Sequence, residues 1–191
     1  MIQNEAELRE NLGYAGKAAQ IKVLPEIDDI CRAFIKNSPF VLLGSTDANG
    51  SMDVSPKGDP AGFVQVMDNK TLLIPDRPGN RRGDTLSNIL QNPNIGLLFL
   101  VPGRGDTLRV NGTAQIVRDD EVRERFIMQG KVPIFVIAVT VKEVFFHCTK
   151  CVVRSGLWSS EYGNDKLVSL GEAIIKHAKL DMSVEEADAF T

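Results

Sequence analysis

The sequence predicts a mainly β (α+β) fold: an antiparallel split β-barrel of six to seven strands, with helices at both ends of the chain. First, short runs rich in β-branched and aromatic residues, separated by tight turns, recur from residue 40 to residue 148. Second, one amphipathic stretch at 84–92 interrupts these runs and is expected to be an inserted helix. Third, closing the sheet into a barrel would remove the strand edges that an open sheet leaves exposed.

Seven segments are expected to form strands, each bounded by residues that favour turns. The first two are joined through Asn49-Gly50, a dipeptide typical of tight hairpins. The last segment is either one long strand or a bent one. The predicted strands are 40–46, 51–55, 62–67, 71–75, 95–101, 107–117 and 134–148.

Helical spacing of apolar residues marks both ends of the chain and one connection. In 25–37 the apolar residues recur at helical intervals, and Pro25 suits a first helical turn. At the other end, Ser183 and Glu186 have the spacing of a capping box. Further helices are expected at 119–130, 165–179 and 183–190.

These patterns divide the chain into three parts. The expected organisation is an N-terminal helical segment (1–37), a barrel domain (38–158) and a C-terminal helical extension (159–191). No internal repeat or low-complexity segment is apparent in the sequence.

Composition limits the possible partners. A hydrophobic fraction of 43% and a charged fraction of 25% are ordinary for a globular protein of 191 residues. The net charge of −3 gives no global attraction to nucleic acid or anionic lipid, so neither is expected as a partner. No apolar run is long enough to span a membrane, and the polar N-terminus is unlike a secretory signal. Three cysteines in such a chain predict reduced thiols and a cytoplasmic location.

The stretch RPGNRR (77–82) places three arginines just before the expected helix at 84–92. Asn80 is a good N-cap candidate, which would put Arg81 and Arg82 in the first helical turn. Cations are mildly unfavourable there, because a helix N-terminus already carries partial positive charge. A bound phosphate would reverse the balance, since backbone N–H groups and guanidinium groups would converge on it. The alternative, two solvated arginines on a loop, is equally compatible with this pattern alone.

A second polar segment, DVSPKGDPAG (53–62), falls where two strands should pair. Pro56 and Pro60 lack the N–H group that a strand ladder needs, while Ser55 and Lys57 offer a hydroxyl and a cation. The simplest interpretation of this segment alone is a wide, bulged turn.

Taken together, these segments resemble the pyridoxamine 5′-phosphate oxidase-like family of FMN-binding split barrels. The run TLLIPDRPGNRRGDTLSNILQNPNIGLLFLVPG (71–103) carries the resemblance most clearly. LGSTDANGSMDVSPKGD (43–59) is similar to the first hairpin of the family, and LRVNGTAQIV (108–117) to a later strand with a central glycine. The resemblance covers roughly residues 38 to 158, and it implies FMN as the cofactor.

The resemblance also implies roles for individual residues. Arg81 and Arg82 would bind the FMN phosphate, with Asn80 capping and contacting it, although the family usually has Ser or Thr at that position. The segment Ser55, Pro56 and Lys57 would run beside the flavin ring, largely through backbone groups. Further flavin contacts are implied for Ile74, Pro75, Asp76 and Thr107. Trp158, the single tryptophan, is either a core residue or a ring that stacks on the flavin.

The expected function is that of an FMN-dependent oxidoreductase acting on a small molecule, with no obligatory catalytic side chain. Arg109, His147 and Arg154 are the candidates for touching the substrate. The C-terminus lacks the Arg-rich segment that closes over the vitamin in true pyridoxamine phosphate oxidases, which argues against vitamin B6 oxidation. A flavin or haem carrier or sensor, and a reductase that uses the deazaflavin F420, remain alternatives.

Two further expectations concern metals and assembly. HCTKC (147–151) offers one ligand fewer than a usual zinc set, so free thiols are predicted, with zinc or a redox disulfide as alternatives. The family resemblance implies a homodimer with flavin at the subunit interface. The strands at 95–101 and 134–141 support it, because they are apolar on both faces, and a lone barrel covers only one face of each strand.

Overall fold

The structure is a computed structural model that describes the whole chain except residue 80, residues 160–166 and residues 190–191. It divides into two compact units, Met1–Ser155 and Gly156–Thr191. The first unit contains the barrel. The second contains two helices, α7 (Leu170–Ala178) and α8 (Val184–Asp188), and α8 begins with the predicted capping box of Ser183 and Glu186.

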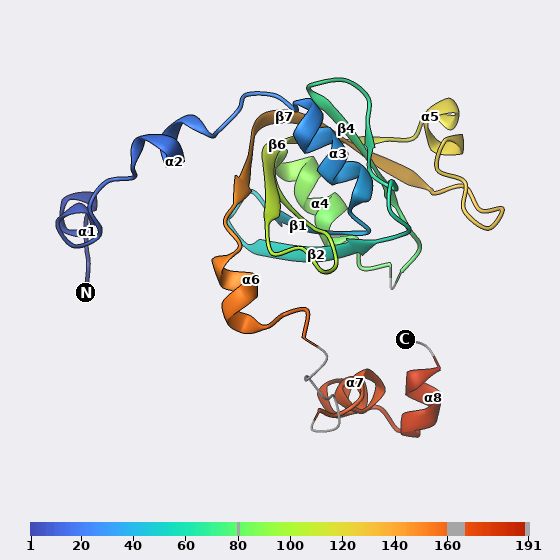
Figure 1. Ribbon diagram of the computed structural model, residues 1–191. Helices are drawn as coiled ribbons and strands as arrows, with labels where there is room; N and C mark the ends of the chain where they lie inside the picture. Colours follow the sequence, from blue (N-terminus) through green and yellow to red (C-terminus); the bar gives the residue numbers. More distant parts are fainter. Residues whose placement is uncertain (80, 160–166, 190–191) are drawn as a thin grey trace. The chain divides into compact units, whose positions relative to one another are not determined.

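Seven antiparallel strands form one sheet in the order β2-β1-β5-β6-β7-β4-β3 (Figure 1). This arrangement confirms the predicted split-barrel α+β class. The predicted strand at 62–67 is shorter than expected, because Phe63 and Val64 are buried outside the regular ladder. The strands are β1 (Phe40–Thr46), β2 (Met52–Gly58), β3 (Gln65–Val66), β4 (Thr71–Asp76), β5 (Asn94–Leu100), β6 (Thr107–Val117) and β7 (Phe135–His147).

The first unit also contains helices, only some of which pack against the sheet. In the first unit they are α1 (Glu5–Leu12), α2 (Lys17–Ile21), α3 (Asp29–Asn37), α4 (Asp84–Gln91), α5 (Asp120–Glu124) and α6 (Lys150–Ser155). Helix α3 contacts β3 and β6, whereas α4 contacts β1, β2 and β6 (Figure 1). Helix α3 begins four residues after Pro25, because Asp28 caps it by accepting a hydrogen bond from the backbone N–H of Cys31. The predicted helix at 119–130 is reduced to the short α5.

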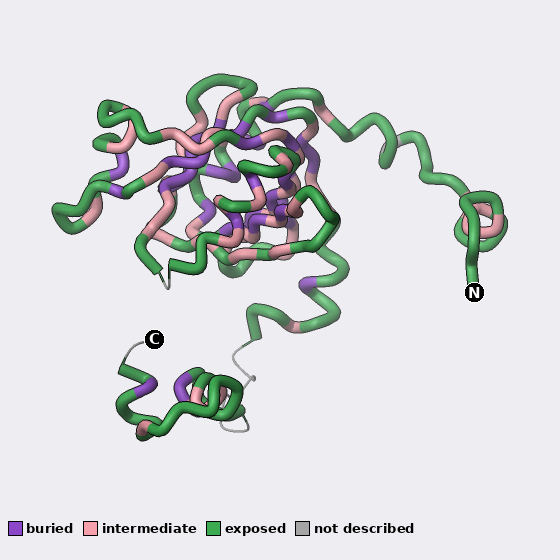
Figure 2. The backbone as a smooth tube through the Cα atoms, turned by 180° about the vertical axis from the view of Figure 1, so that it is seen from behind, coloured by how far each residue is buried: buried purple, intermediate pink, exposed green. Residues whose placement is uncertain are grey.

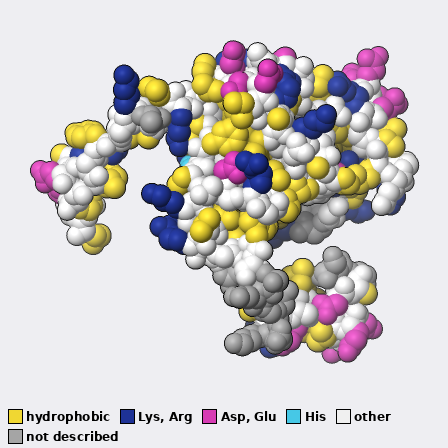
Figure 3. All heavy atoms as spheres, viewed as in Figure 1, with side chains coloured by type: hydrophobic (Ala, Val, Ile, Leu, Met, Phe, Trp, Pro, Cys, Tyr) yellow, Lys and Arg dark blue, Asp and Glu magenta, His cyan; other side chains and the backbone are white. Residues whose placement is uncertain are grey.

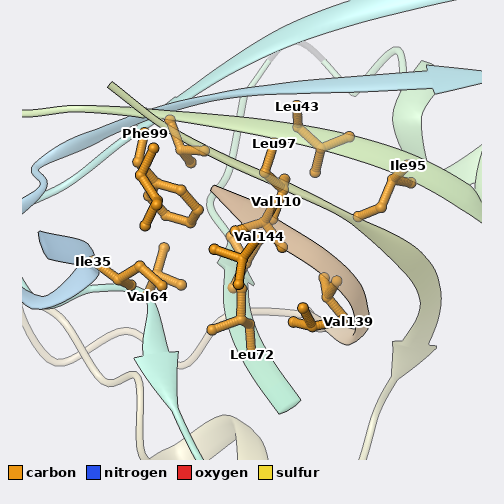
Figure 4. Close-up of a cluster of buried hydrophobic side chains, with 14 of the residues drawn as sticks. Ile35, Leu43, Val64, Leu72, Ile95, Leu97, Phe99, Val110, Val139 and Val144 are labelled. Atoms are coloured by element: carbon orange, nitrogen blue, oxygen red, sulfur yellow. The ribbon is translucent and has the colours of Figure 1, made fainter. Parts of the chain in front are cut away.

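The barrel interior is a continuous apolar core. Buried positions concentrate inside the barrel in Figure 2, while the connections outside it are mostly exposed. Figure 4 shows side chains from several strands pointing toward one another, with Ile35 of α3 reaching the same cluster. Inward residues alternate with outward ones along β1 and β5, so each strand presents a second face away from the core.

Strand β7 changes partners along its length. Its first half pairs with β4, while its second half is bridged on that edge by Leu24, which exchanges two backbone hydrogen bonds of 2.9 Å with Val144. The β6–β7 ladder contains a register shift between Asn111 and Gly112. A Cβ atom at Gly112 would fall on the backbone carbonyl of Thr140, well inside van der Waals contact. Glycine is therefore required there by close backbone approach.

Replacing Gly112 by Ala should lower the free energy of unfolding by about 1–3 kcal/mol, the usual cost of forcing extra atoms into a packed site. Denaturant unfolding of the full chain measures this loss. Gly44→Ala is the matched control, because a Cβ atom in that strand would meet its nearest neighbour, the Gly96 carbonyl oxygen, at an ordinary 3.8 Å. Equal stabilities of the two variants would contradict the close approach.

Candidate functional site

A cavity of about 510 Å³ opens between the edge strand β2, the end of β4 and the start of α4. Its volume is within the range of small-molecule sites, about 300–1,000 Å³. The loop from Arg77 to Gly83 forms one wall, and Ile134 and Phe135 before and at the start of β7 form another. The predicted residues that line this cavity are Ser55, Pro56, Lys57, Asp76, Arg81 and Arg82.

Strand β2 supplies one side of the cavity through its residue alternation. Asp53, Ser55 and Lys57 share one face, because successive side chains of a strand point to opposite sides. The segment does not form the bulged turn that its two prolines suggested. It continues as a strand through Gly58, because β2 is the outermost strand of the sheet and Pro56 needs no partner for its missing N–H group.

The basic loop precedes α4 instead of forming its first turn, which corrects one prediction. The N-cap is Gly83, not Asn80, and Arg81 and Arg82 lie before the helix. Gly83 takes a left-handed conformation (φ 70°), and the following Asp84 puts a negative charge in the first turn, where the helix dipole favours it. Asn80 itself lies outside the described residues.

Two features of this loop bear on ligand binding. Arg81 has φ 62°, a conformation that costs a non-glycine residue about 1–3 kcal/mol and that clusters at functional sites. Gly83 offers no side-chain acceptor, so the cap of α4 makes no side-chain hydrogen bond to the N–H groups of the first turn. The start of α4 is thus suited to an acceptor brought from outside the helix.

Acidic side chains hold the basic ones in place around the cavity. Arg77 is fixed by Asp59 (Nε to Oδ2, 2.6 Å), and Lys57 lies 3.4 Å from Asp76. Arg82 pairs with Asp84 at 2.7 Å, and the hydrogen bond and the charge of Asp84 raise the pKa of that guanidinium. The cavity wall is therefore built from ion pairs that restrict how its basic side chains can move.

On the other side of the helix start, Thr85 donates a 2.9 Å hydrogen bond from Oγ1 to Oδ2 of Asp53. Thr85 is buried, so this bond ties α4 to β2 at the floor of the cavity. Asp53, Thr85 and Arg77 were not anticipated from sequence. The alternation along β2 could have identified Asp53, since it shares a face with Ser55 and Lys57.

Comparison with known proteins now assigns the family. A model of the pyridoxamine 5′-phosphate oxidase family, which covers its N-terminal part, matches residues 27–148. The chain belongs to the pyridoxamine 5′-phosphate oxidase family. A search of curated proteins finds no match.

Solved structures agree with this assignment. HupZ of Group A Streptococcus is 22% identical and superposes with a TM-score of 0.52, covering 63% of this chain and 93% of HupZ; this likeness shows a shared fold. A Lactobacillus delbrueckii protein that is provisionally named a pyridoxamine 5′-phosphate oxidase is 26% identical, with a TM-score of 0.50, covering 64% of this chain and 95% of that one.

Some of the residues predicted from the family resemblance do not line the cavity. Ile74 and Pro75 are buried in β4, behind the cavity wall. Arg154 is exposed on α6. Trp158 belongs to the second unit, which is described by itself, so its predicted flavin contact stays a prediction. Thr107 is 7% exposed and lies opposite His147 in the β6–β7 ladder.

Arg109 and His147 lie on the outward face of β6 and β7, where they form a second polar cluster. The Arg109 guanidinium carbon is 4.2 Å from the centroid of the Phe145 ring, and the His147 ring is 5.0 Å from the same ring. Lys22, after α2, approaches the ring from another side at 5.2 Å. Sequence reasoning missed Lys22, because 124 residues separate it from its hydrogen-bond partner Phe146.

Within the described residues, no three His, Cys, Asp or Glu side chains gather closely enough to hold a metal ion. No described helix has the length and apolar character needed to cross a membrane. Figure 3 shows basic side chains on the drawn face of the barrel interspersed with acidic ones.

The three cysteines are free thiols in different surroundings. Cys148 and Cys151 are exposed, whereas Cys31 is buried in the core. Burial, followed by the hydrogen bond and charge of Asp28, raises the pKa of the Cys31 thiol to about 12. We expect an aromatic disulfide reagent at pH 8 to modify two thiols in the native protein and the third only after denaturation, because the thiolate is the reactive form. Stoichiometric zinc, or fewer than two reactive thiols in freshly reduced protein, would contradict this expectation.

Proposed function

We propose that the protein is an FMN-dependent oxidoreductase of this family, acting on a small-molecule substrate. The observation that carries the proposal is the cavity itself, where a basic loop meets a helix start that has no side-chain cap. A phosphate ester is the ligand that this combination suits, because it accepts hydrogen bonds from several backbone N–H groups and guanidinium groups at once.

The residues present fit the phosphate of FMN. Arg81 and Arg82 line the cavity beside the first turn of α4, and Lys57 lies across from them on β2. The left-handed backbone of Arg81 is the kind of local strain that a bound ligand can offset. In this proposal Arg81 and Arg82 hold the phosphate, while Asp84 orients Arg82 through their 2.7 Å contact.

The remaining walls suit a flat ring. The backbone of β2 at Ser55, Pro56 and Lys57 forms an edge with no neighbouring strand on its outer side, so its hydrogen-bonding groups are open to a ligand. Phe135 adds an apolar surface. Asp76 orients the Lys57 ammonium group from the end of β4.

Bound FMN would supply the redox chemistry, accepting or delivering a hydride at N5. The chain's own residues bind and orient the cofactor, and none of those lining the cavity is required as an acid or base. The free thiols are consistent with a reducing, cytoplasmic location, which belongs to the same proposal.

A homodimer is the second part of the proposal. The outward face of the sheet carries an apolar row in which Pro56, Leu42 and Leu98 are neighbours on β2, β1 and β5. Met52 and Val54, on the outward face of β2, are 71% and 62% exposed. An exposed apolar face of this kind marks an interaction surface. A second copy of the chain is the occupant we propose, with the flavin bound beside the contact.

The visible spectrum of the purified protein tests the cofactor. Maxima near ~375 and ~450 nm indicate FMN, a Soret band indicates haem, and a single band near ~420 nm indicates a deazaflavin. Bleaching of the flavin by NADH or NADPH, followed by reoxidation with an added acceptor, separates an enzyme from a carrier. A colourless protein that takes up none of these cofactors would refute the proposed function.

A further inference from the structure

The outward cluster on β6 and β7 has more positive charge than its surroundings neutralise. Arg109 and Lys22 both lie over the Phe145 ring, at 4.2 and 5.2 Å. Burial lowers the pKa of His147, and the positive charges of Arg109 and Lys22 lower it further. Glu143 is the acidic neighbour of the cluster, and its Oε1 already accepts a 2.7 Å hydrogen bond from Asn111.

Arg109 is held in place by the ring more than by hydrogen bonds. Its Nη2 lies 3.5 Å from Glu143 Oε1, at the outer limit of a hydrogen bond. The Nε atom of Arg109 is buried and has no hydrogen-bond partner, and no other buried side-chain nitrogen or oxygen among the described residues lacks one. The Phe145 ring holds the Arg109 guanidinium on the sheet surface, while the other N–H groups of the guanidinium remain available to a ligand.

The backbone holds Lys22 in a similar way. The bridge between Leu24 and Val144 fastens the N-terminal segment along the edge of β7. The Lys22 ammonium group then donates a 2.8 Å hydrogen bond to the carbonyl of Phe146, which leaves two of its three N–H donors available. Three groups from three segments of the chain therefore surround one ring.

We infer that Lys22, Arg109 and His147 form a second anion site, which holds the carboxylate or phosphate group of the substrate. This inference rests on the proposed function and assigns its substrate class, a small organic anion. The cluster extends the apolar row of Pro56, Leu42 and Leu98 on the outward face of the sheet, since Arg109 lies between Leu98 and Phe145 in register. A ligand bound there lies on the same face as the proposed dimer contact.

An anion in this site would reverse the repulsion that His147 experiences. The charged groups facing His147 are Arg109, Lys22 and, beyond Arg109, Glu143. A bound anion favours the imidazolium form, so it raises the pKa of His147. By the same linkage, the anion binds more tightly as the pH falls through that pKa, because protonation of His147 adds a third cation.

Nuclear magnetic resonance of the histidine ring protons tests this directly. The chain has two histidines, and His177 on α7 serves as an internal reference. The full chain without added flavin is titrated with pH in inorganic phosphate, in acetate and in chloride at equal ionic strength. We expect phosphate or acetate to raise the pKa of His147 relative to chloride, while the ring signals of His177 do not depend on the anion. The responding anion distinguishes a phosphate ligand from a carboxylate ligand.

Variants assign the effect to the cluster. Arg109→Met keeps an apolar stem over Phe145 and removes the charge, and it should weaken the anion about tenfold or more, as expected for loss of a charge-assisted hydrogen bond. Arg104→Met is the matched control, because Arg104 also lies over a phenylalanine ring but forms a bidentate pair with Asp106. Arg81→Ala/Arg82→Ala should leave the His147 response intact, which excludes binding at the flavin phosphate site.

An unchanged pKa of His147 in both anions, or a full response in Arg109→Met, overturns the inference. Failure of the proposed function is read separately, from the absence of cofactor in the visible spectrum. Lys22→Met provides a second variant if Arg109→Met does not fold, with the same direction expected.

Discussion

Replacing both Arg81 and Arg82 by alanine should weaken FMN binding at least about a hundredfold, as expected for loss of two charge-assisted contacts to one phosphate. Both side chains line the cavity next to the uncapped start of α4. Both are also exposed and precede the helix, so their removal should leave the barrel core intact. The measurement is fluorescence titration of the apoprotein with FMN, together with circular dichroism to confirm folding.

A matched control separates a specific phosphate contact from a general charge effect. Arg118 and Arg125 are arginines outside the cavity lining, so Arg118→Ala/Arg125→Ala changes the net charge by the same amount. This control should bind FMN like the wild type. Riboflavin, which lacks the phosphate, should bind equally weakly to the wild type and to the Arg81/Arg82 variant. If the Arg81/Arg82 variant purifies with as much FMN as the wild type, the phosphate site is wrongly assigned.

Local chemistry was enough to predict most of the sheet. The β6 strand occupies the predicted 107–117, because the turn residues before it and the apolar alternation within it leave no competing register. The strand order also explains why Pro56 does not interrupt β2. Pro56 would disturb only a central strand, and the position of β2 at the sheet edge depends on contacts distant in sequence.

The start of α4 shows where side-chain preference misleads. Asn80 is a better capping residue than Gly83 by its side chain, yet the helix begins after Gly83. The helix starts where Gly83 adopts a left-handed backbone conformation and Asp84 places a favourable charge in the first turn. A residue pattern alone does not predict that backbone conformation.

The two polar sites differ in how far sequence could predict them. The two segments that supply Ser55, Lys57, Arg81 and Arg82 to the cavity could be named together through the family resemblance. In the outward cluster, Arg109 and His147 were already named as substrate candidates, but Lys22 joins them only because the chain passes along β7 at the Leu24 bridge. Such a contact arises from the packed fold and has no local signal.

The second large expected effect concerns the outward face of the sheet. Placing charges on it should abolish the dimer and flavin binding together. Leu42 and Leu98 are neighbours in register on β1 and β5, and both point away from the core. Replacing both by aspartate places two charges on each protomer's contact surface, which a two-fold interface would meet twice. Burying an unpaired charge is strongly unfavourable, so the subunits should separate.

Light scattering coupled to size exclusion measures this, with and without FMN. The wild type should elute with twice the chain mass of 21.0 kDa and with bound flavin. The Leu42→Asp/Leu98→Asp variant should elute at the chain mass with most of its flavin lost, because a ligand held at a shared site is linked to association. Ile30→Asp/Val153→Asp is the control, since these apolar residues are 68% and 70% exposed on α3 and α6 and are not part of this sheet face. A wild type that is monomeric with flavin bound would refute both the dimer and the shared site. A Leu42→Asp/Leu98→Asp variant that remains dimeric would show that the subunits contact each other through another surface.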